Sequence, residues 1–264
     1  MTKLLVLILL IMGIGVVMTM TGRGGGNFYV LILALGGISM HEAAATGQLI
    51  LVATATTAFL LFQKKRIIAW KMVFLIGPIV AAMAFIGGYC SKIITGRMLK
   101  FTFSGLLVVA AFLMLTKIYE RQGVLKRKPG YWLLRSGQSE YLVNLWLALP
   151  VTIATGFAAG MVGVSGGSFL VPLMVLACGM PMQTAVGTST AMVATTAAMG
   201  FAGHAINGDF NPHWALPLVA AAVIGGLIGG RLALKTKPSF LKKLFAYTTL
   251  AAAIFMALNA YFSN

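Results

Sequence analysis

The sequence is poor in charged residues, and only four of its 264 residues are acidic. Charged residues make up 9% of the chain, whereas about a quarter is usual in a soluble domain. This shortage excludes an ordinary soluble domain. It also argues against intramembrane hydrolysis by paired carboxylates, because no two acidic residues fall on one face of a single predicted membrane helix. The acidic residues are Glu42, Glu120, Glu140 and Asp209.

Cysteine is almost absent, and nucleotide-binding motifs are missing. The only cysteines, Cys90 and Cys178, lie far apart, without a CxxC motif or the Cys/His spacing of a metal site. No Walker-type P-loop is present, which argues against pumping driven by nucleotide hydrolysis within this chain. We therefore predict no catalytic residues, no bound metal and no cofactor.

Apolar residues are abundant, at 59% of the chain, and the mean hydropathy is +0.95. Eight apolar runs have roughly the 20 residues that cross a bilayer core; they cover 3–21, 43–62, 70–91, 97–119, 141–162, 184–204, 213–234 and 240–262. Two shorter apolar runs cover 28–38 and 168–179. The first long run could be a signal peptide, but residues 21–24 offer no cleavage site, so we interpret it as a membrane helix. The sequence predicts an all-α, polytopic membrane protein.

A glycine cluster occurs twice, as GRGGGNF at 22–28 and GVSGGSF at 163–169. An offset of about 142 also aligns HEAAATGQ with QTAVGTST, one IGG with another, and MLK with FLK. Several matches in the same order indicate an internal duplication. We predict a first membrane repeat at 1–119, a basic cytoplasmic linker at 120–140 and a second repeat at 141–264, each repeat with about five helical elements.

The basic residues predict that the two repeats are inverted relative to each other. Fifteen of the twenty Lys and Arg residues lie in 63–71, 117–140 and 231–243, which the positive-inside rule assigns to the cytoplasm. The repeat partner of the first of these loops, 204–213, has no Lys or Arg and is predicted outside. The net charge of +16 could also suggest nucleic-acid binding, but the basic residues separate hydrophobic runs and lack interleaved aromatics. We predict no nucleic-acid partner.

Each short run has too few residues to span the membrane as a helix, since about 12 residues rise only about 18 Å against a core of about 30 Å. Non-helical backbone must then lie at depth, where it is tolerated only inside protein or beside a polar cavity. Inverted repeats with broken helices are typical of secondary transporters. A simpler interpretation, that glycine only lets helices pack closely, suits Gly156 and Gly160.

A helix break exposes backbone N–H groups and the positive end of a helix dipole, which together attract anions. We predict such ends at the glycine clusters and at the starts of the following helices, 45–48 and 187–190. Hydroxyls in membrane helices often bond to their own backbone instead, so each Ser or Thr has two interpretations. The predicted substrate-binding residues are Arg23, Gly24, Gly25, Gly26, Asn27, Thr46, Gln48, Ser165, Gly166, Gly167, Ser168, Thr188 and Ser189.

Five ionisable residues have competing interpretations. Arg23 could contact an oxyanion or mark the cytoplasmic mouth by reaching toward lipid headgroups. His41 and Glu42 are candidates for proton coupling, although they fall where an outer connection is expected. We interpret His204, with His213, as part of the surface of an outer loop rather than as a metal site.

Together these segments resemble a known family. The stretches GFAAGMVGVSGGSFLVPLM (156–174) and QTAVGTSTAMVATTAAMG (183–200), with the looser copies GRGGGNFYVLIL (22–33) and EAAATGQL (42–49), resemble the TauE/SafE sulfite exporter family, also called TSUP or DUF81. The first copy departs from the second at Gln48, which aligns with Thr190, and at Leu31, which aligns with Pro172. The resemblance implies transport of sulfur-containing anions across a prokaryotic inner membrane.

The sequence alone is compatible with several functions and transport mechanisms. The scarcity of membrane carboxylates favours export driven by the membrane potential over uptake coupled to protons. An anion channel, a proton-coupled importer of sulfate-type or thiosulfate-type anions, and a non-transporting scaffold are the alternatives. The expected partners are a small anion and the lipid bilayer, and homodimerisation stays open.

Overall fold

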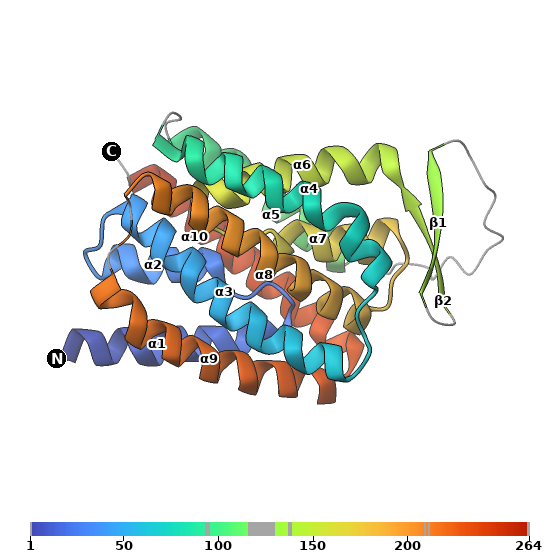
Figure 1. Cartoon of the computed structure of the whole chain (residues 1–264), viewed down its shortest axis with the longest axis horizontal. Helices are drawn as coiled ribbons and strands as arrows, with labels where there is room; N and C mark the ends of the chain where they lie inside the picture. The colour runs from blue at the N-terminus through green and yellow to red at the C-terminus, as the bar shows by residue number, and fades with distance from the viewer. Residues whose placement is uncertain are drawn as a thin grey trace.

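The structure is a computed structural model that describes residues 2–92, 96–115, 130–136, 139–208, 210 and 212–262. These residues are mainly helical (Figure 1). The first half contains α1 (Thr2–Met20), α2 (Gly26–Leu35), α3 (Met40–Lys64), α4 (Trp70–Tyr89), a short 3-10 turn (Cys90–Lys92) and α5 (Gly96–Leu115). The second contains α6 (Leu145–Val162), α7 (Gly167–Pro172), a π-helical turn (Leu173–Ala177), α8 (Met182–Ile206), α9 (Pro212–Lys235) and α10 (Pro238–Phe262).

The predicted all-α, polytopic membrane class is confirmed, and every predicted long run coincides with a helix to within a few residues. Four helices are long and apolar enough to cross a membrane; they cover His41–Lys64, Trp70–Tyr89, Leu145–Val162 and Ala215–Lys235. Many large apolar side chains on the helices are exposed, as expected where lipid rather than water is the surrounding solvent. The chain is a multi-pass membrane protein.

One local prediction needs correction, because the fifth long apolar run, 141–162, begins as a strand. β1 (Tyr131–Ser136) pairs antiparallel with β2 (Ser139–Asn144), and α6 therefore starts at Leu145 rather than at 141. Asn144 caps this helix by accepting a hydrogen bond from the Trp146 N–H. Residues 120–129 and 137–138 of the predicted basic linker lie outside the described residues.

Helix directions follow from glycines that pack directly on neighbouring backbones. Gly156 of α6 packs on Val80 of α4, and one turn later Gly160 packs on Ala84, so these helices run parallel. Successive glycine contacts of the same kind show that α8 is parallel to α4. They also show that α1 and α3 are both parallel to α9. α3 and α8 are antiparallel, since Gly187 near the start of α8 lies beside Ile67 after α3, and Gly200 near its end lies beside Gln48.

The two halves therefore traverse the bundle in opposite senses. Helices α1, α3 and α9 run one way and α6, α8 and α4 run the other, so α1, α3 and α4 oppose their sequence counterparts α6, α8 and α9. Gly156 and Gly160 fit the simple packing interpretation. This arrangement is the one that an inverted repeat requires; the repeat itself stays a prediction.

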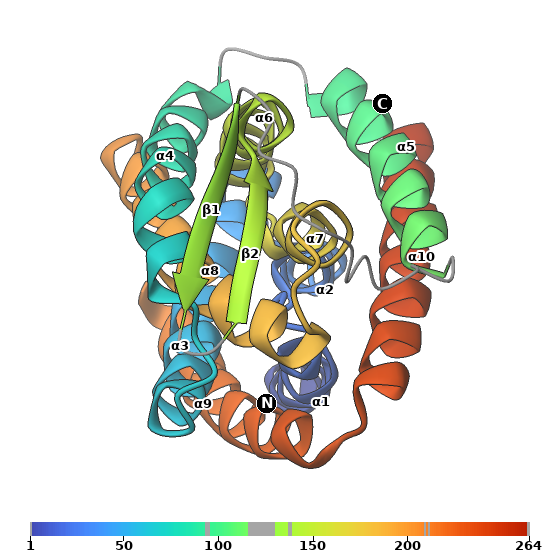
Figure 2. The same ribbon diagram turned by 90° about the vertical axis from the view of Figure 1, so that its right-hand side faces the viewer.

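The helices form two unequal layers. α5 and α10 pair with each other along one side, and the other long helices form the main bundle (Figure 2). α2 and α7 lie between these layers in the same view. The hairpin and the connection between α3 and α4 lie at the end opposite both chain termini (Figure 1).

Candidate functional site

The first helix break lies between α1 and α2. α1 ends at Met20, and the N–H groups of Gly22 and Arg23 turn back to the carbonyls of Thr19 and Met18. Gly25, which precedes α2, has a φ of 96°, a left-handed conformation that residues with a side chain rarely adopt. The glycine-rich sequence at 22–26 thus ends one helix and starts another within five residues.

The second helix break lies between α6 and α7. Gly163 ends α6 in a left-handed conformation with a φ of 74°, and the N–H of Val164 bonds to Ala159 O. Ser165 Oγ then accepts a hydrogen bond of 3.2 Å from the N–H of Gly167, the first residue of α7. Pro172 lacks an N–H, and the chain beyond it continues as the π-helical turn.

The two breaks touch each other. A Cβ on Gly26 would lie 2.9 Å from Ser165 N, and a Cβ on Gly167 would lie 2.7 Å from Gly22 O. Asn27 Oδ1 also accepts a hydrogen bond of 3.2 Å from Ser165 N. The N-terminal ends of α2 and α7 therefore meet, at a place that we call the junction.

Each break also packs on the third helix of the opposite half. A Cβ on Gly22 would lie 2.8 Å from the Val186 Cα in α8, and a Cβ on Gly163 would lie 2.6 Å from the Ala44 Cα in α3. The two contacts correspond to each other in the repeat alignment, in which Gly22 matches Gly163 and Ala44 matches Val186. Ser189 adds a hydrogen bond across the same boundary, because its hydroxyl donates to Gly22 O at 3.0 Å.

The junction lies near the middle of the bundle. Gly24 packs against Leu51 and Val193, which are each the twelfth of the 25 residues of α3 and α8. A helix of 25 residues is about 37 Å long, so its centre lies close to the middle of a bilayer core of about 30 Å. All thirteen predicted substrate-binding residues are buried. In this conformation the junction is closed to bulk solvent.

Arg23 is the cation at the junction, and its side chain is only 1% exposed. Its Nε donates to Ser168 Oγ at 3.0 Å, and its Nη1 donates to Thr249 Oγ1 at 2.9 Å. The guanidinium also lies over the Phe245 ring, 5.3 Å from the ring centroid. Among the described residues no carboxylate pairs with it. A guanidinium has five N–H donors, so three are left without an acceptor in that part of the chain.

The hydroxyl groups around Arg23 fall into two classes. Ser189 uses its proton on Gly22 O, so it is not free to donate to a bound anion in this conformation. Ser168 and Ser165 act as acceptors, from Arg23 Nε and from Gly167 N. A hydroxyl that accepts a hydrogen bond keeps its own proton available for donation. The two serines of the second break are thus better suited than Ser189 to contact an anion.

Three other predicted binding residues that the structure describes have no hydrogen bond to Arg23. Thr188 Oγ1 accepts a hydrogen bond of 3.0 Å from Ala69 N in the connection between α3 and α4. Gln48 Nε2 donates to Ala159 O of α6, and Gln48 Oε1 is buried without a partner among the described residues. Thr46 is buried within α3.

The predicted helix starts at 45–48 and 187–190 are wrong. α3 begins at Met40 and α8 at Met182, so both segments lie inside helices. Backbone N–H groups there are used within the helix and are not available to an anion. The prediction failed because small and polar residues resemble a helix start in sequence, whereas the actual start of α3 is capped by Ser39.

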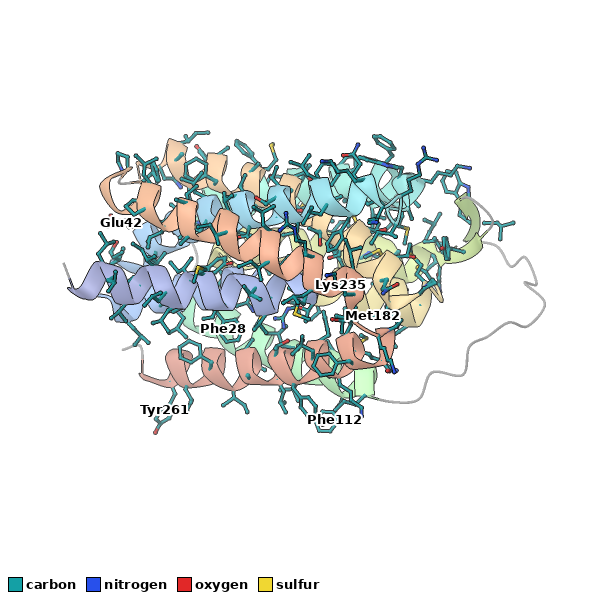
Figure 3. The ribbon with its side chains drawn as sticks, turned by 90° about the horizontal axis from the view of Figure 1, so that it is seen from below. Phe28, Glu42, Phe112, Met182, Lys235 and Tyr261 are labelled. Carbon is teal, nitrogen blue, oxygen red and sulfur yellow. The ribbon has the colours of Figure 1, made fainter. Side chains whose placement is uncertain are left out.

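His41 and Glu42 lie in the first turn of α3, where His41 is exposed and Glu42 is partly buried. Figure 3 shows Glu42 at the same end of the molecule as Tyr261, away from Met182. Their role in proton coupling stays a prediction.

The placement of His204 on a loop surface is wrong. His204 belongs to α8 and is fully buried, with Nε2 2.9 Å from Gly160 O and Nδ1 3.4 Å from Ser91 Oγ. Because a carbonyl only accepts, Nε2 carries a proton. The prediction took the end of the apolar run at 204 as the end of the helix, whereas α8 continues to Ile206. Asp209 lies outside the described residues.

Two residues of α10 at the junction, Thr249 and Phe245, were missed by the sequence analysis. Both are fully buried and contact Arg23. Neither belongs to a glycine cluster or to an aligned repeat segment. A threonine or phenylalanine within an apolar helix carries no distinguishing signal in one sequence.

Residues 7–256 match the family model described as Sulfite exporter TauE/SafE. The chain is 26% identical over 203 residues to the probable membrane transporter protein YunE of Bacillus subtilis, which covers 74% of this chain and 72% of that protein. It is 23% identical over 237 residues to a probable membrane transporter protein of Xylella fastidiosa, covering 89% and 86%. No solved structure matches. The family and these relatives are named for transport rather than catalysis, and the match spans both helix breaks and nearly every helix. The chain therefore belongs to the sulfite exporter TauE/SafE family.

Proposed function

We propose that this protein is a secondary transporter that exports small sulfur-containing anions, such as sulfite or an organosulfonate, by alternating access. The observation that carries the proposal is Arg23, a buried cation where two helix breaks meet, with no carboxylate partner among the described residues. The family name supports a sulfur oxyanion as the substrate.

An anion at the junction would offset the free-energy cost of burying the Arg23 guanidinium. Burying an ionised guanidinium without an opposite charge is unfavourable, because it loses its hydration. The unused N–H donors of Arg23 and the hydroxyls of Ser165 and Ser168 could replace the water shell of an oxyanion. Bidentate contact between a guanidinium and an oxyanion also fixes the orientation of the ligand.

The opposed directions of the two halves support alternating access. In inverted-repeat transporters, one half or bundle moves against the other around a central site. The junction lies near the mid-length of α3 and α8 and takes residues from both halves. Its burial from both ends favours a carrier over a channel, since an open channel would expose the residues that line it.

The basic loops support an orientation and a direction. The segments 63–71 and 231–243 lie at one end of the bundle, because α3 and α9 run parallel and end there. We assign this end, together with 117–140, to the cytoplasmic side of a bacterial inner membrane. An interior-negative potential contributes about 2.3 kcal/mol per charge for each 100 mV, which drives anions outward without a coupling ion.

Flux through purified protein in proteoliposomes tests the proposal. Sulfite, sulfate, thiosulfate, sulfoacetate and taurine are offered in turn under an imposed potassium diffusion potential, with protein-free liposomes as the control. We expect saturable, potential-dependent flux of at least one sulfur-containing anion. Absence of flux for the whole panel contradicts the proposal, and unitary currents in a planar bilayer identify a channel instead.

Arg23→Gln tests the residue that carries the proposal. We expect a rise in the half-saturation concentration of roughly tenfold or more, because a hydrogen bond to a charged group contributes about 1.5–3 kcal/mol. Arg231→Gln is the matched control, since Arg231 is exposed on α9 and loses the same charge. An unchanged concentration dependence in Arg23→Gln would leave Arg23 with a structural role at the junction alone.

A further inference from the structure

We infer that Thr249 and Phe245 of α10 are positioning residues that hold the Arg23 guanidinium in place for anion binding, an inference that rests on the proposed function. Both lie on one face of α10, because they are four residues apart in a helix. Both side chains are fully buried. Phe245 places its ring against the guanidinium, and Thr249 binds one of its N–H groups.

The hydrogen bonds of Thr249 show which role its hydroxyl can take. Thr249 Oγ1 donates its proton to Phe245 O at 2.6 Å in its own helix. The same oxygen accepts the Arg23 Nη1 proton at 2.9 Å. With its only proton used on the backbone, the hydroxyl acts toward the junction as an acceptor. Thr249 is therefore suited to orient the cation and unsuited to donate to an anion.

Arg23 needs support from outside its own segment. The residues on both sides of it, Gly22 and Gly24, are glycines with left-handed φ values of 73° and 69°, so no neighbouring side chain in the break restrains it. Ser168 binds Nε from the α7 side, and Thr249 binds Nη1 from the α10 side. Two partners on different elements fix the plane of the guanidinium and leave its remaining N–H groups with a defined direction.

The contact also links the two layers of the protein. α10 packs mainly against α5, in the layer separate from the main bundle (Figure 2). Thr249 is the twelfth of the 25 residues of α10, which places it at the same depth as the junction. A shift of α10 relative to the bundle would therefore change how Arg23 is held.

Thr249→Val removes the acceptor with little change in shape and is the principal test. We expect a rise of roughly ten- to a hundredfold in the half-saturation concentration for the transported anion, with a smaller effect on the maximal rate. Thr249→Ser keeps the hydroxyl and should restore most of the affinity. Thr248→Val is the matched control, because the Thr248 hydroxyl bonds only to the carbonyls of Leu244 and Phe245 in its own helix.

A double-mutant cycle separates positioning from a general loss of structure. If Thr249 acts through Arg23, adding Thr249→Val to Arg23→Gln should cause little further loss of affinity. Full additivity, or equal affinities in Thr249→Val and Thr248→Val, would overturn the inference while leaving transport itself established. If Thr249→Val is not recovered folded, Thr249→Ala with the same comparisons decides the question. A wild-type protein without anion flux would instead contradict the proposed function.

Discussion

Replacing Gly167 with alanine tests whether the contact between the two helix breaks controls transport. A Cβ at this position would lie 2.7 Å from Gly22 O and 3.0 Å from both Arg23 Cα and Ser189 Oγ. Carbon and oxygen atoms in favourable contact are about 3.3 Å apart or more, so the breaks must separate by about 0.6 Å. Two of the three nearest atoms belong to the backbone and cannot rotate away. Overpacking of this kind typically costs about 1–3 kcal/mol.

The displacement falls on Arg23 itself, so the substitution should impair transport in protein that is still folded. A misplacement of about 1 Å at a functional site can reduce a rate by about a hundredfold. For a shift of about half that size, we expect anion flux in proteoliposomes to fall by roughly tenfold, with the protein still inserted and folded in detergent. Circular dichroism and gel filtration of the purified variant check the second expectation.

Gly166→Ala is the matched control, one residue away in the same cluster. Its new Cβ would meet its nearest atom, Thr155 Cγ2, at 3.6 Å, an ordinary contact, and Gly166 has a φ of −62° that alanine adopts readily. We expect near-normal flux from this variant. Equal flux from Gly166→Ala and Gly167→Ala would refute the reasoning, because sequence treats these glycines alike and only the structure separates them.

Two further predictions concern ionisable side chains outside the junction. His204→Leu removes a buried contact with Gly160 O and should lower stability by about 1–3 kcal/mol, measured as a lower thermal midpoint in detergent; an unchanged midpoint would show that the contact is dispensable. Glu42→Gln should leave anion flux and its pH dependence unchanged, because Glu42 lies nine residues, or about 14 Å along the axis of α3, from Leu51 beside the junction. Loss of the pH dependence in Glu42→Gln would instead support proton coupling.

The sequence was sufficient to predict the membrane class and the places where helices end. Long apolar runs report helix length directly, since a bilayer core sets how many residues must be apolar. The glycine clusters marked both breaks for a local reason, because the left-handed residues at 24 and 25 in the first break and at 163 in the second favour glycine. Arg23 could also be singled out, as a cation next to glycines in an apolar chain.

The sequence could not separate residues of similar type that face different neighbours. Ser189 and Thr188 are adjacent in one predicted binding segment, yet Ser189 bonds to Gly22 O and Thr188 bonds to Ala69 N. Adjacent residues on a helix point about 100° apart, so which of them reaches the site depends on how the helix is rotated against its neighbours. His204 was misplaced because α8 continues to Ile206, beyond the end of the apolar run.

What the sequence by itself determined is the set of properties that depend on local composition: apolar helices, their breaks at glycine, and the uneven distribution of basic loops. What only the tertiary structure decided is the environment of Arg23. Its partners Ser168 and Thr249 are 145 and 226 residues away along the chain. Contacts over such separations arise from the packing of whole helices, and nothing in the local sequence around position 23 specifies which distant side chains that packing will place beside it.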